Sequence, residues 1–185
     1  MPSRVVILVG CSGSGKSTYA LRQFPGAIVV SADHYFERLA KRSRRSYVRV
    51  FDTWQLRYAH AECLERFIEA LSAGTPIVIV DNTNVAISDR QRYIKRAQEY
   101  GIEAELHVLG PWLHGAPEPT PDEIQCYVTA CHGRARHGAP FEVISQQLSK
   151  LELPSGIYRA GKPPQFLREI PTQARAKKPH LSRTP

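Results

Sequence analysis

The sequence has few cysteines and no long apolar run. Its four cysteines, Cys11, Cys63, Cys126 and Cys131, lack the paired spacing of a zinc knuckle or a disulfide framework. No apolar run approaches the roughly 20 residues that would span a bilayer. The N-terminus also lacks a charged and then apolar leader with a cleavage site. We therefore expect no membrane association, and we expect a cytoplasmic chain with reduced thiols.

Acidic residues are scarce in two stretches, although the whole chain has a formal net charge of only +8. Residues 38–49 contain six Lys and Arg and no acid, and residues 159–185 contain seven against one glutamate. Clustered cations gain binding energy by displacing counterions from phosphates, so this segregation predicts a polyanionic partner, nucleic acid before others. The alternative is an exposed helix face and a solvated tail.

Four short apolar runs rich in β-branched residues predict strands near residues 4–9, 27–30, 76–80 and 104–109. Runs that are apolar on both faces are typical of parallel strands covered by helices. Helical patterns lie between them, at 17–23, at 52–73 before Gly74, after the capping boxes Ser88–Gln91 and Thr120–Glu123, and at 142–151. We therefore predict an α/β fold: a three-layer α/β/α P-loop NTPase or kinase with a parallel sheet, whose ligands bind at the carboxyl ends of the strands.

The length of 185 residues suits one domain. We assign residues 1–160 to it. Residues 161–185 are basic and repeatedly interrupted by proline, so we expect a disordered tail there.

The segment Gly10-Cys-Ser-Gly-Ser-Gly-Lys-Ser17 matches GxxxxGK[ST] directly after a predicted strand and before a predicted helix. Glycines let the backbone N–H groups converge on phosphate oxygens, and the helix directs its positive end at them. We expect ATP and Mg²⁺ here, with Lys16 on the β- and γ-phosphates and Ser17 on the metal. The nucleotide-binding residues expected are Gly10, Cys11, Ser12, Gly13, Ser14, Gly15, Lys16, Ser17 and Thr18.

Two aspartates follow predicted strands and therefore lie at the same edge of the sheet as this loop. Asp81 is placed like the acid that holds Mg²⁺ through water, or it caps the turn after its strand. Asp33 can orient an acceptor hydroxyl and take its proton, and it can also be the N-cap of the helix that follows. We expect Asp81 at the metal and Asp33 as the catalytic base.

A loop near residues 132–140 carries Arg134 and Arg136 between glycines. Arginines in such a loop can close over ATP, stabilise the developing charge and exclude water. The alternative is a solvated surface connection. We expect this loop to be a lid that carries Arg134 and Arg136. Together with Lys16 of the phosphate loop, these two arginines are the expected catalytic cations.

Together these segments resemble the P-loop kinase domain of polynucleotide 5′-hydroxyl kinases, and more closely the related kinase-like AAA-type domains fused to nuclease modules in certain ubiquitin-ligase-binding proteins. The resemblance rests on Gly10–Thr18, Ser31–Phe36, Ala59-His60, Val80–Asn84 and Arg134–Pro140. It implies transfer of the ATP γ-phosphate to the 5′-hydroxyl of DNA or RNA. The acceptor contacts expected from the basic cluster and from the Val80–Asn84 motif are Arg38, Arg42, Arg44, Arg45, Asn82 and Asn84.

The chain departs from this pattern in two places. Some polynucleotide kinases have an arginine three residues after the catalytic aspartate, where this chain has Phe36, and relatives often have asparagine where it has Ala135. Two other functions therefore remain open: a kinase for a small sugar, nucleoside or antibiotic, and an ATP-gated nucleic-acid-binding module without transferase activity.

Overall fold

The computed structural model describes residues 4–111 and 119–153, so the predicted tail at 161–185 lies outside the described residues. All strand pairs in its sheet are parallel, in the order β2-β3-β1-β4. The strands are β1 (Arg4–Val9), β2 (Ile28–Val30), β3 (Ile77–Val80) and β4 (Ala104–Val108). The four predicted strands are confirmed, each within one residue of its expected bounds.

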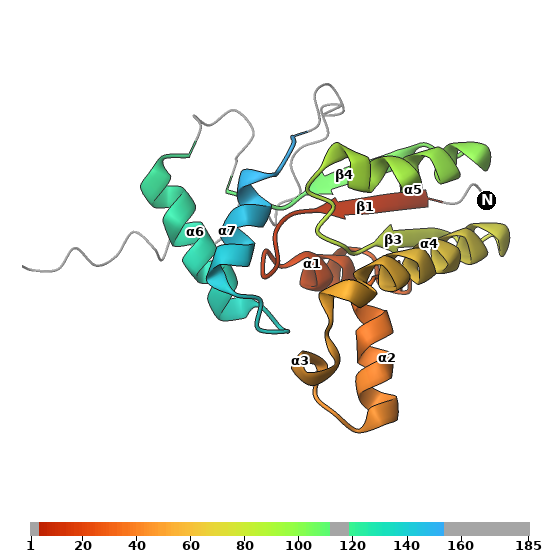
Figure 1. Ribbon diagram of the computed structural model, residues 1–185. Coiled ribbons are helices and arrows are strands. Elements are labelled where there is room, and N and C mark those ends of the chain that lie inside the picture. Colours follow the sequence, from red (N-terminus) through yellow and green to blue (C-terminus); the bar gives the residue numbers. More distant parts are fainter. Residues whose placement is uncertain (1–3, 112–118, 154–185) are drawn as a thin grey trace, which may run out of the picture.

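Helices follow each of these strands (Figure 1). They are α1 (Lys16–Gln23), α2 (Asp33–Ser43), α3 (Tyr47–Val50), the 3₁₀ turn η1 (Thr53–Gln55), α4 (Leu56–Ser72), α5 (Ile87–Glu99), α6 (Pro121–Arg134) and α7 (Phe141–Ser149). Right-handed crossovers of this kind place successive helices on the faces of a parallel sheet.

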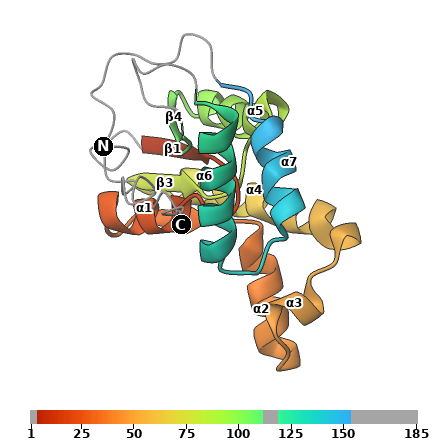
Figure 2. The ribbon, with the colours of Figure 1, turned by 90° about the vertical axis from the view of Figure 1, so that its left-hand side faces the viewer.

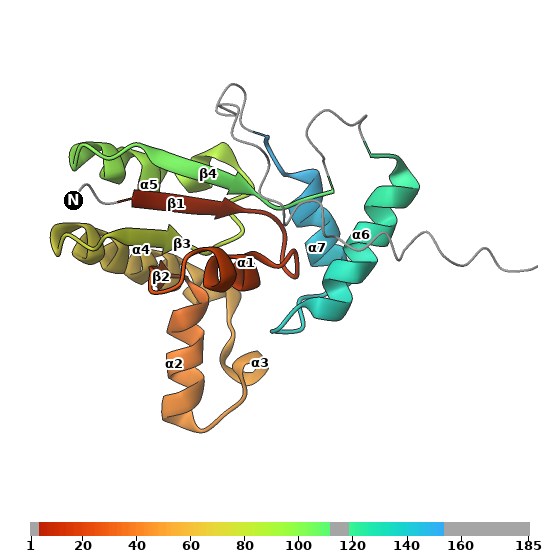
Figure 3. The ribbon, with the colours of Figure 1, turned by 180° about the vertical axis from the view of Figure 1, so that it is seen from behind.

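The alternation of side chains along β1 builds two cores. Val5 and Ile7 face a cluster that includes Phe67 of α4 and Tyr93 of α5, and all four are fully or almost fully buried. Val6 and Leu8 face the opposite side, where they pack with Tyr19 and Ala20 of α1 and with Phe24. Figures 1 and 3 show α4 and α5 on one face and α1 on the other. The predicted three-layer α/β/α architecture with a parallel sheet is therefore confirmed.

Helices α6 and α7 form a third packed unit across the carboxyl ends of the strands (Figure 2). Their apolar cluster includes Val128, Cys131 and Ile144, and it also contains Cys11 of the loop after β1. The predicted cap of α6 is confirmed, because the Thr120 Oγ1 accepts the Glu123 N–H at 3.3 Å and the Glu123 carboxylate accepts the Thr120 N–H at 2.9 Å. This unit therefore packs directly on the candidate phosphate loop.

The start of α5 differs from the prediction. The helix begins at Ile87 after the extended residue Ala86, whose N–H donates to the Asp89 Oδ2 at 3.2 Å. The capping box predicted at Ser88–Gln91 is therefore wrong. Asp89, which lies three residues after Ala86, satisfies the free backbone donor, so the helix needs no serine cap.

Helices α2 and α3 project from the sheet as a hairpin between β2 and α4 (Figure 1). Phe36 is fully buried and anchors the first turns of α2 in the main core. Arg44 ends the helix in the left-handed conformation, with φ 54°. Within the described ranges, no helix is both long and apolar enough to cross a membrane.

Candidate active site

The loop Gly10–Ser17 joins the end of β1 to the first turn of α1, as the motif requires. Gly15 precedes α1 with φ 95°, a conformation that favours glycine. At Gly13, with φ 74°, an added Cβ would lie 2.0 Å from the carbonyl oxygen of Cys131 on α6. Glycine is therefore needed at position 13 both for the backbone turn and for close packing against α6.

Lys16 is buried, with 8 % of its surface exposed. Its Nζ donates to the carbonyl oxygens of Gly10 at 3.0 Å and Cys11 at 2.8 Å, so the ammonium lies over the loop that it serves. Burial lowers the pKa of Lys16, and the carboxylates of Asp81 and Asp33 act against that shift. Both carboxylates are therefore close enough to influence this ammonium.

Hydrogen bonds between the strand ends fix the loop against the rest of the edge. The Gly10 N–H donates to the carbonyl of Thr83 at 2.9 Å, and the Asn84 side chain donates to the carbonyl of Leu8 at 2.7 Å. The Asp81 N–H donates to Val30 of β2 at 2.9 Å. The ends of β1, β2 and β3 consequently form one rigid frame for the phosphate loop.

The groups expected at the metal fit a magnesium nucleotide. Ser17 is exposed at the first turn of α1, and Asp81 is half-buried at the end of β3. Among the residues that the structure describes, no group of three or more His, Cys, Asp and Glu could hold a metal by itself. A Mg²⁺ held mainly by phosphates and water needs only one or two protein oxygens, which Ser17 and Asp81 can supply.

Asp33 is the first residue of α2 and is exposed. Its Oδ1 accepts a hydrogen bond from the Tyr47 hydroxyl at 2.6 Å. Ala32 occupies the N-cap position, and the Ser31 Oγ accepts the Asp33 N–H at 3.2 Å. The alternative role of Asp33 as the helix N-cap is therefore wrong, and its carboxylate points toward the α3 side of the hairpin.

The expected lid contacts α2 rather than the phosphate loop. Arg136 and His137 both approach the Oε1 of Glu37, at 3.4 and 3.5 Å. The His137 ring also stacks on Tyr47, with ring centroids 3.7 Å apart. Helix α6 extends to Arg134, so the first part of the expected loop at 132–140 is helical and its loop is shorter than predicted.

Arg134 is the last residue of α6, and its Nη2 lies 3.8 Å from the Sγ of Cys131. The Cys131 Sγ in turn lies 3.8 Å from the Sγ of Cys11 in the phosphate loop. The hydrogen bond from Cys11 and the contact with Arg134 lower the pKa of Cys131. The two lid arginines therefore point to different partners, Arg136 to α2 and Arg134 to α6.

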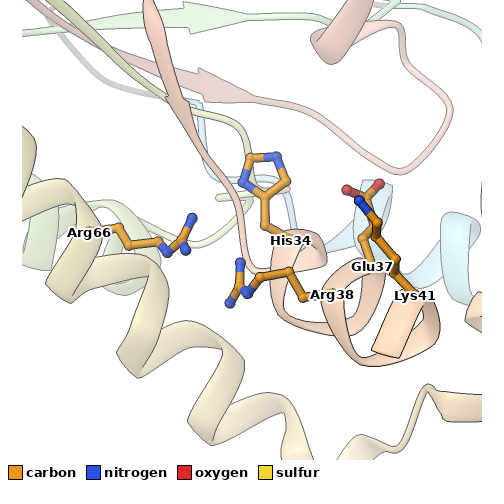
Figure 4. A pocket seen from close by; sticks show the side chains of 5 residues that line it. All are labelled: His34, Glu37, Arg38, Lys41 and Arg66. Carbon is orange, nitrogen blue, oxygen red and sulfur yellow. The ribbon is translucent and has the colours of Figure 1, made fainter. Parts of the chain in front are cut away.

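A hollow of about 330 Å³ lies between α2 and α4 (Figure 4). Its lining is mostly cationic. Arg38 forms an ion pair with Glu62 of α4, and Arg66 reaches the same carboxylate at 3.1 Å. The five lining residues are His34, Glu37, Arg38, Lys41 and Arg66.

The other expected acceptor residues separate into two groups. Arg42, Arg44 and Arg45 are exposed at the end of α2 that projects away from the sheet (Figure 1). At 1.5 Å per helical residue, this end is roughly 14 Å or more from Asp33. They can therefore contact only an acceptor that extends along the whole helix.

Asn82 and Asn84 are buried and have structural hydrogen bonds. The Asn82 Oδ1 accepts the Ala32 N–H at 2.9 Å, and its Nδ2 donates to the Tyr93 hydroxyl at 3.2 Å. Asn84 adopts φ 47° and holds β1, as described above. Both amides support the frame of the site instead of lining the hollow.

Sequence reasoning missed four residues that the fold brings to the site. Tyr47 bonds to Asp33, His137 stacks on Tyr47, Cys131 lies beside Cys11, and the Gln147 Oε1 of α7 accepts the Ser12 N–H at 2.8 Å. Only Tyr47 had a local sign, because it is an aromatic residue within the basic stretch 38–49. The other three contacts join segments more than 80 residues apart and leave no trace in local spacing.

The sequence matches the family model described as an AAA domain over residues 5–154, which is most of the chain. Three solved structures share the fold. A gluconokinase from Sinorhizobium meliloti 1021 is 24 % identical, with a TM-score of 0.51, and the match covers 91 % of this chain and 87 % of that one. A sugar kinase from Janibacter sp. HTCC2649 is 18 % identical, with a TM-score of 0.51 and coverages of 84 % and 81 %.

The third structure is the Pnkp1/Rnl/Hen1 RNA repair complex, in which the matched chain is 18 % identical with a TM-score of 0.54. The match covers 80 % of this chain but 44 % of that one. At these identities the similarity establishes the fold alone. With the family match and the phosphate loop that the structure describes, the chain belongs to the AAA domain family and has the P-loop NTPase or kinase fold.

Proposed function

We propose that this P-loop kinase transfers the terminal phosphate of ATP to a hydroxyl group of a small polar acceptor. The observation that carries the proposal is that Lys16, Asp81 and Asp33 all lie at the carboxyl edge of the sheet: Lys16 begins α1 after β1, Asp81 follows β3 and bonds to the end of β2, and Asp33 begins α2 after β2. A phosphate cradle, a metal-side carboxylate and a second, exposed carboxylate are the parts that phosphoryl transfer to a hydroxyl requires.

In this mechanism each side chain has one task. The Gly10–Ser17 backbone binds the phosphates, and Lys16 supplies a fixed positive charge where negative charge develops. Mg²⁺, when bound at Ser17 and Asp81, neutralises the phosphate oxygens. Asp33 orients the acceptor hydroxyl and takes its proton as the new P–O bond forms and the bond between the γ-phosphorus and the bridging oxygen breaks to release ADP. Arg136 would help only after it leaves Glu37, whereas Arg134 lies at the end of α6 beside Cys131.

The hollow of about 330 Å³ beside α2 favours a small acceptor. The hollow is open to solvent, and its lining residue His34 directly follows Asp33, so a small polar molecule bound there would lie near the start of α2. Arg38, Lys41 and Arg66 give the lining a cationic character that suits an acceptor with a carboxylate or phosphate group. The similarity to a gluconokinase over most of both chains supports a sugar or sugar acid.

A second candidate is the 5′-hydroxyl of DNA or RNA. The exposed Arg42, Arg44 and Arg45 continue the cationic surface beyond the hollow. Trp54, in η1 at the base of the hairpin, is 84 % exposed, and an exposed aromatic ring can stack on a base. The partial similarity to the chain in the RNA repair complex supports this candidate less, because it covers under half of that chain.

One assay separates the two candidates. The protein is incubated with γ-labelled ATP and Mg²⁺, together with gluconate, a panel of sugars and nucleosides, or 5′-hydroxyl DNA and RNA oligonucleotides. Asp33→Asn is tested in parallel, with Asp52→Asn as a matched variant outside the site. We expect label on a small acceptor, a loss of about a hundredfold or more in Asp33→Asn, and little change in Asp52→Asn.

Charge variants refine the answer. Neutralising Arg38 and Arg66 should raise the KM for a small anionic acceptor, while neutralising Arg44 and Arg45 should not. Label on oligonucleotides, with a strong salt dependence and sensitivity to Arg44 and Arg45, would instead support the second candidate. Hydrolysis of ATP without labelling of any acceptor would contradict both.

A further inference from the structure

The carboxylate of Asp33 already has a hydroxyl partner in this structure. The Tyr47 hydroxyl donates to its Oδ1 at 2.6 Å, from α3 and 14 positions further along the chain. An O–H···O⁻ bond of this length is charge-assisted and therefore strong. Burial and the hydrogen bond to Asp33 raise the pKa of Tyr47, so the phenol keeps its proton and stays a donor at neutral pH.

The Tyr47 ring is held by residues from three segments. The His137 ring stacks on it with centroids 3.7 Å apart and an interplanar angle of 15°. Phe51 stacks more loosely, with centroids at 5.8 Å, and Phe36 packs edge-on at 5.9 Å. His137 lies in the loop after α6 and also approaches Glu37, one helical turn after Asp33. The lid loop therefore holds the phenol in place.

We propose that Tyr47 is a gate on the candidate base: without an acceptor its hydroxyl occupies Asp33, and an acceptor hydroxyl must displace it. This inference rests on the proposed role of Asp33. While the Tyr47 hydroxyl points at Oδ1, that oxygen is already paired, so Asp33 is less available to water. The gate discriminates an acceptor from water, because only an acceptor also gains contacts elsewhere in the site.

The test measures release of labelled phosphate from γ-labelled ATP without any acceptor. Tyr47→Phe removes the hydroxyl and keeps the ring. We expect this variant to hydrolyse ATP roughly tenfold faster than the wild type, since hydrogen bonds to charged groups are stronger than those between neutral groups. Tyr100→Phe is the matched control, because the Tyr100 hydroxyl bonds instead to the Ser72 Oγ at 2.7 Å, between the ends of α4 and α5; hydrolysis should stay within about twofold of the wild type.

Two further variants make the result interpretable. His137→Ala removes the stacking partner but leaves the phenol, so it should also raise hydrolysis, by less than Tyr47→Phe, and it replaces that variant if Tyr47→Phe fails to fold. Adding Asp33→Asn to Tyr47→Phe should abolish the gain. Once an acceptor is found, Tyr47→Phe should lower its KM several-fold with kcat little changed, a split that loss of structure would not produce.

The outcomes separate the gate from the proposed function. Unchanged hydrolysis in Tyr47→Phe, together with loss of transfer in Asp33→Asn, would overturn the gate and leave Asp33 as the base. Unchanged transfer and hydrolysis in Asp33→Asn would overturn both. Label on Tyr47 itself in the wild type would also overturn the gate, since the phenol would then be an acceptor.

Discussion

The nucleotide side and the acceptor side of this site are built in different ways. Around the phosphate loop, backbone hydrogen bonds join the ends of three strands, and Lys16 is buried with both of its carbonyl contacts inside the loop. Around Asp33, an exposed carboxylate is contacted by side chains from α3 and from the loop after α6. The first side is held by the sheet, whereas the second is held by a hairpin and a loop.

This difference follows from what each side must bind. The phosphates of ATP are the same for every member of a kinase fold, so a rigid backbone cradle suits them. Acceptors differ, and loops and projecting helices can change without altering strand register. We therefore expect substitutions on the nucleotide side to be costly and similar substitutions on the acceptor side to be tolerated.

The largest expected effect is at Lys16. Lys16→Ala removes the positive charge from the phosphate cradle, so kcat should fall by about a thousandfold. Lys95→Ala, on the exposed face of α5, is the matched control and should keep wild-type activity. Steady-state turnover of ATP with an identified acceptor measures both. A fall of less than tenfold in Lys16→Ala would remove the main difference between the two sides.

Alanine substitutions at two glycines compare the backbone constraint on the two sides directly. Gly13→Ala would force a left-handed residue and place a Cβ against the Cys131 carbonyl, so it should lose about 3 kcal/mol of unfolding free energy and most ATP binding. Gly138→Ala, in the lid loop at φ 66°, meets open space and should cost about 1 kcal/mol. Denaturant unfolding and nucleotide titration measure both variants. Equal losses would show that the lid loop is as constrained as the phosphate loop.

Asn82 joins the two sides, since its amide connects Ala32, just before α2, to Tyr93 of α5. Asn82→Ala leaves the buried Ala32 N–H without its acceptor, so stability should fall by about 2 kcal/mol. Gln98→Ala on exposed α5 should change little. Thermal and urea unfolding provide the comparison. If Asn82→Ala instead has normal stability and a raised KM for the acceptor, Asn82 contacts the acceptor.

The smallest effect belongs to the acceptor side. Arg136 is 78 % exposed in its ion pair with Glu37, so Arg136→Ala should change unfolding free energy by less than about 1 kcal/mol. A double-mutant cycle with Glu37→Gln measures the coupling. A coupling above about 2 kcal/mol would mean that the lid is locked onto α2 as firmly as the phosphate loop is fixed to the sheet.

The sequence predicted the fold and the nucleotide side because their signals are local. Apolar runs marked the strands, Thr120 and Glu123 marked the start of α6, and a single contiguous motif marked the loop. The Ser88 cap failed because the helix starts two residues earlier: Asp89 accepts the N–H of Ala86, as Gln91 was expected to do for Ser88.

The acceptor side depends on contacts between residues that are far apart in the sequence, and residue spacing does not reveal such contacts. The Tyr47 hydroxyl reaches Asp33 only because the hairpin folds back, and His137 reaches Tyr47 across 90 positions of sequence. Asn82 and Asn84 matched a family motif, but burial determines how their amides are used. The motif located both asparagines correctly at the strand end, and only the three-dimensional packing revealed their hydrogen-bond partners.

The hairpin that carries Asp33 leaves the sheet after β2 and returns at η1, and the hydrogen bond between Tyr35 and Gln55 fastens its two ends together at the base. A segment whose two ends are joined in this way can be exchanged as one unit. Evolution, or a protein engineer, could lengthen, shorten or exchange it without disturbing the phosphate cradle. New acceptors could then be acquired by replacing one short stretch of sequence while the machinery for ATP is inherited unchanged.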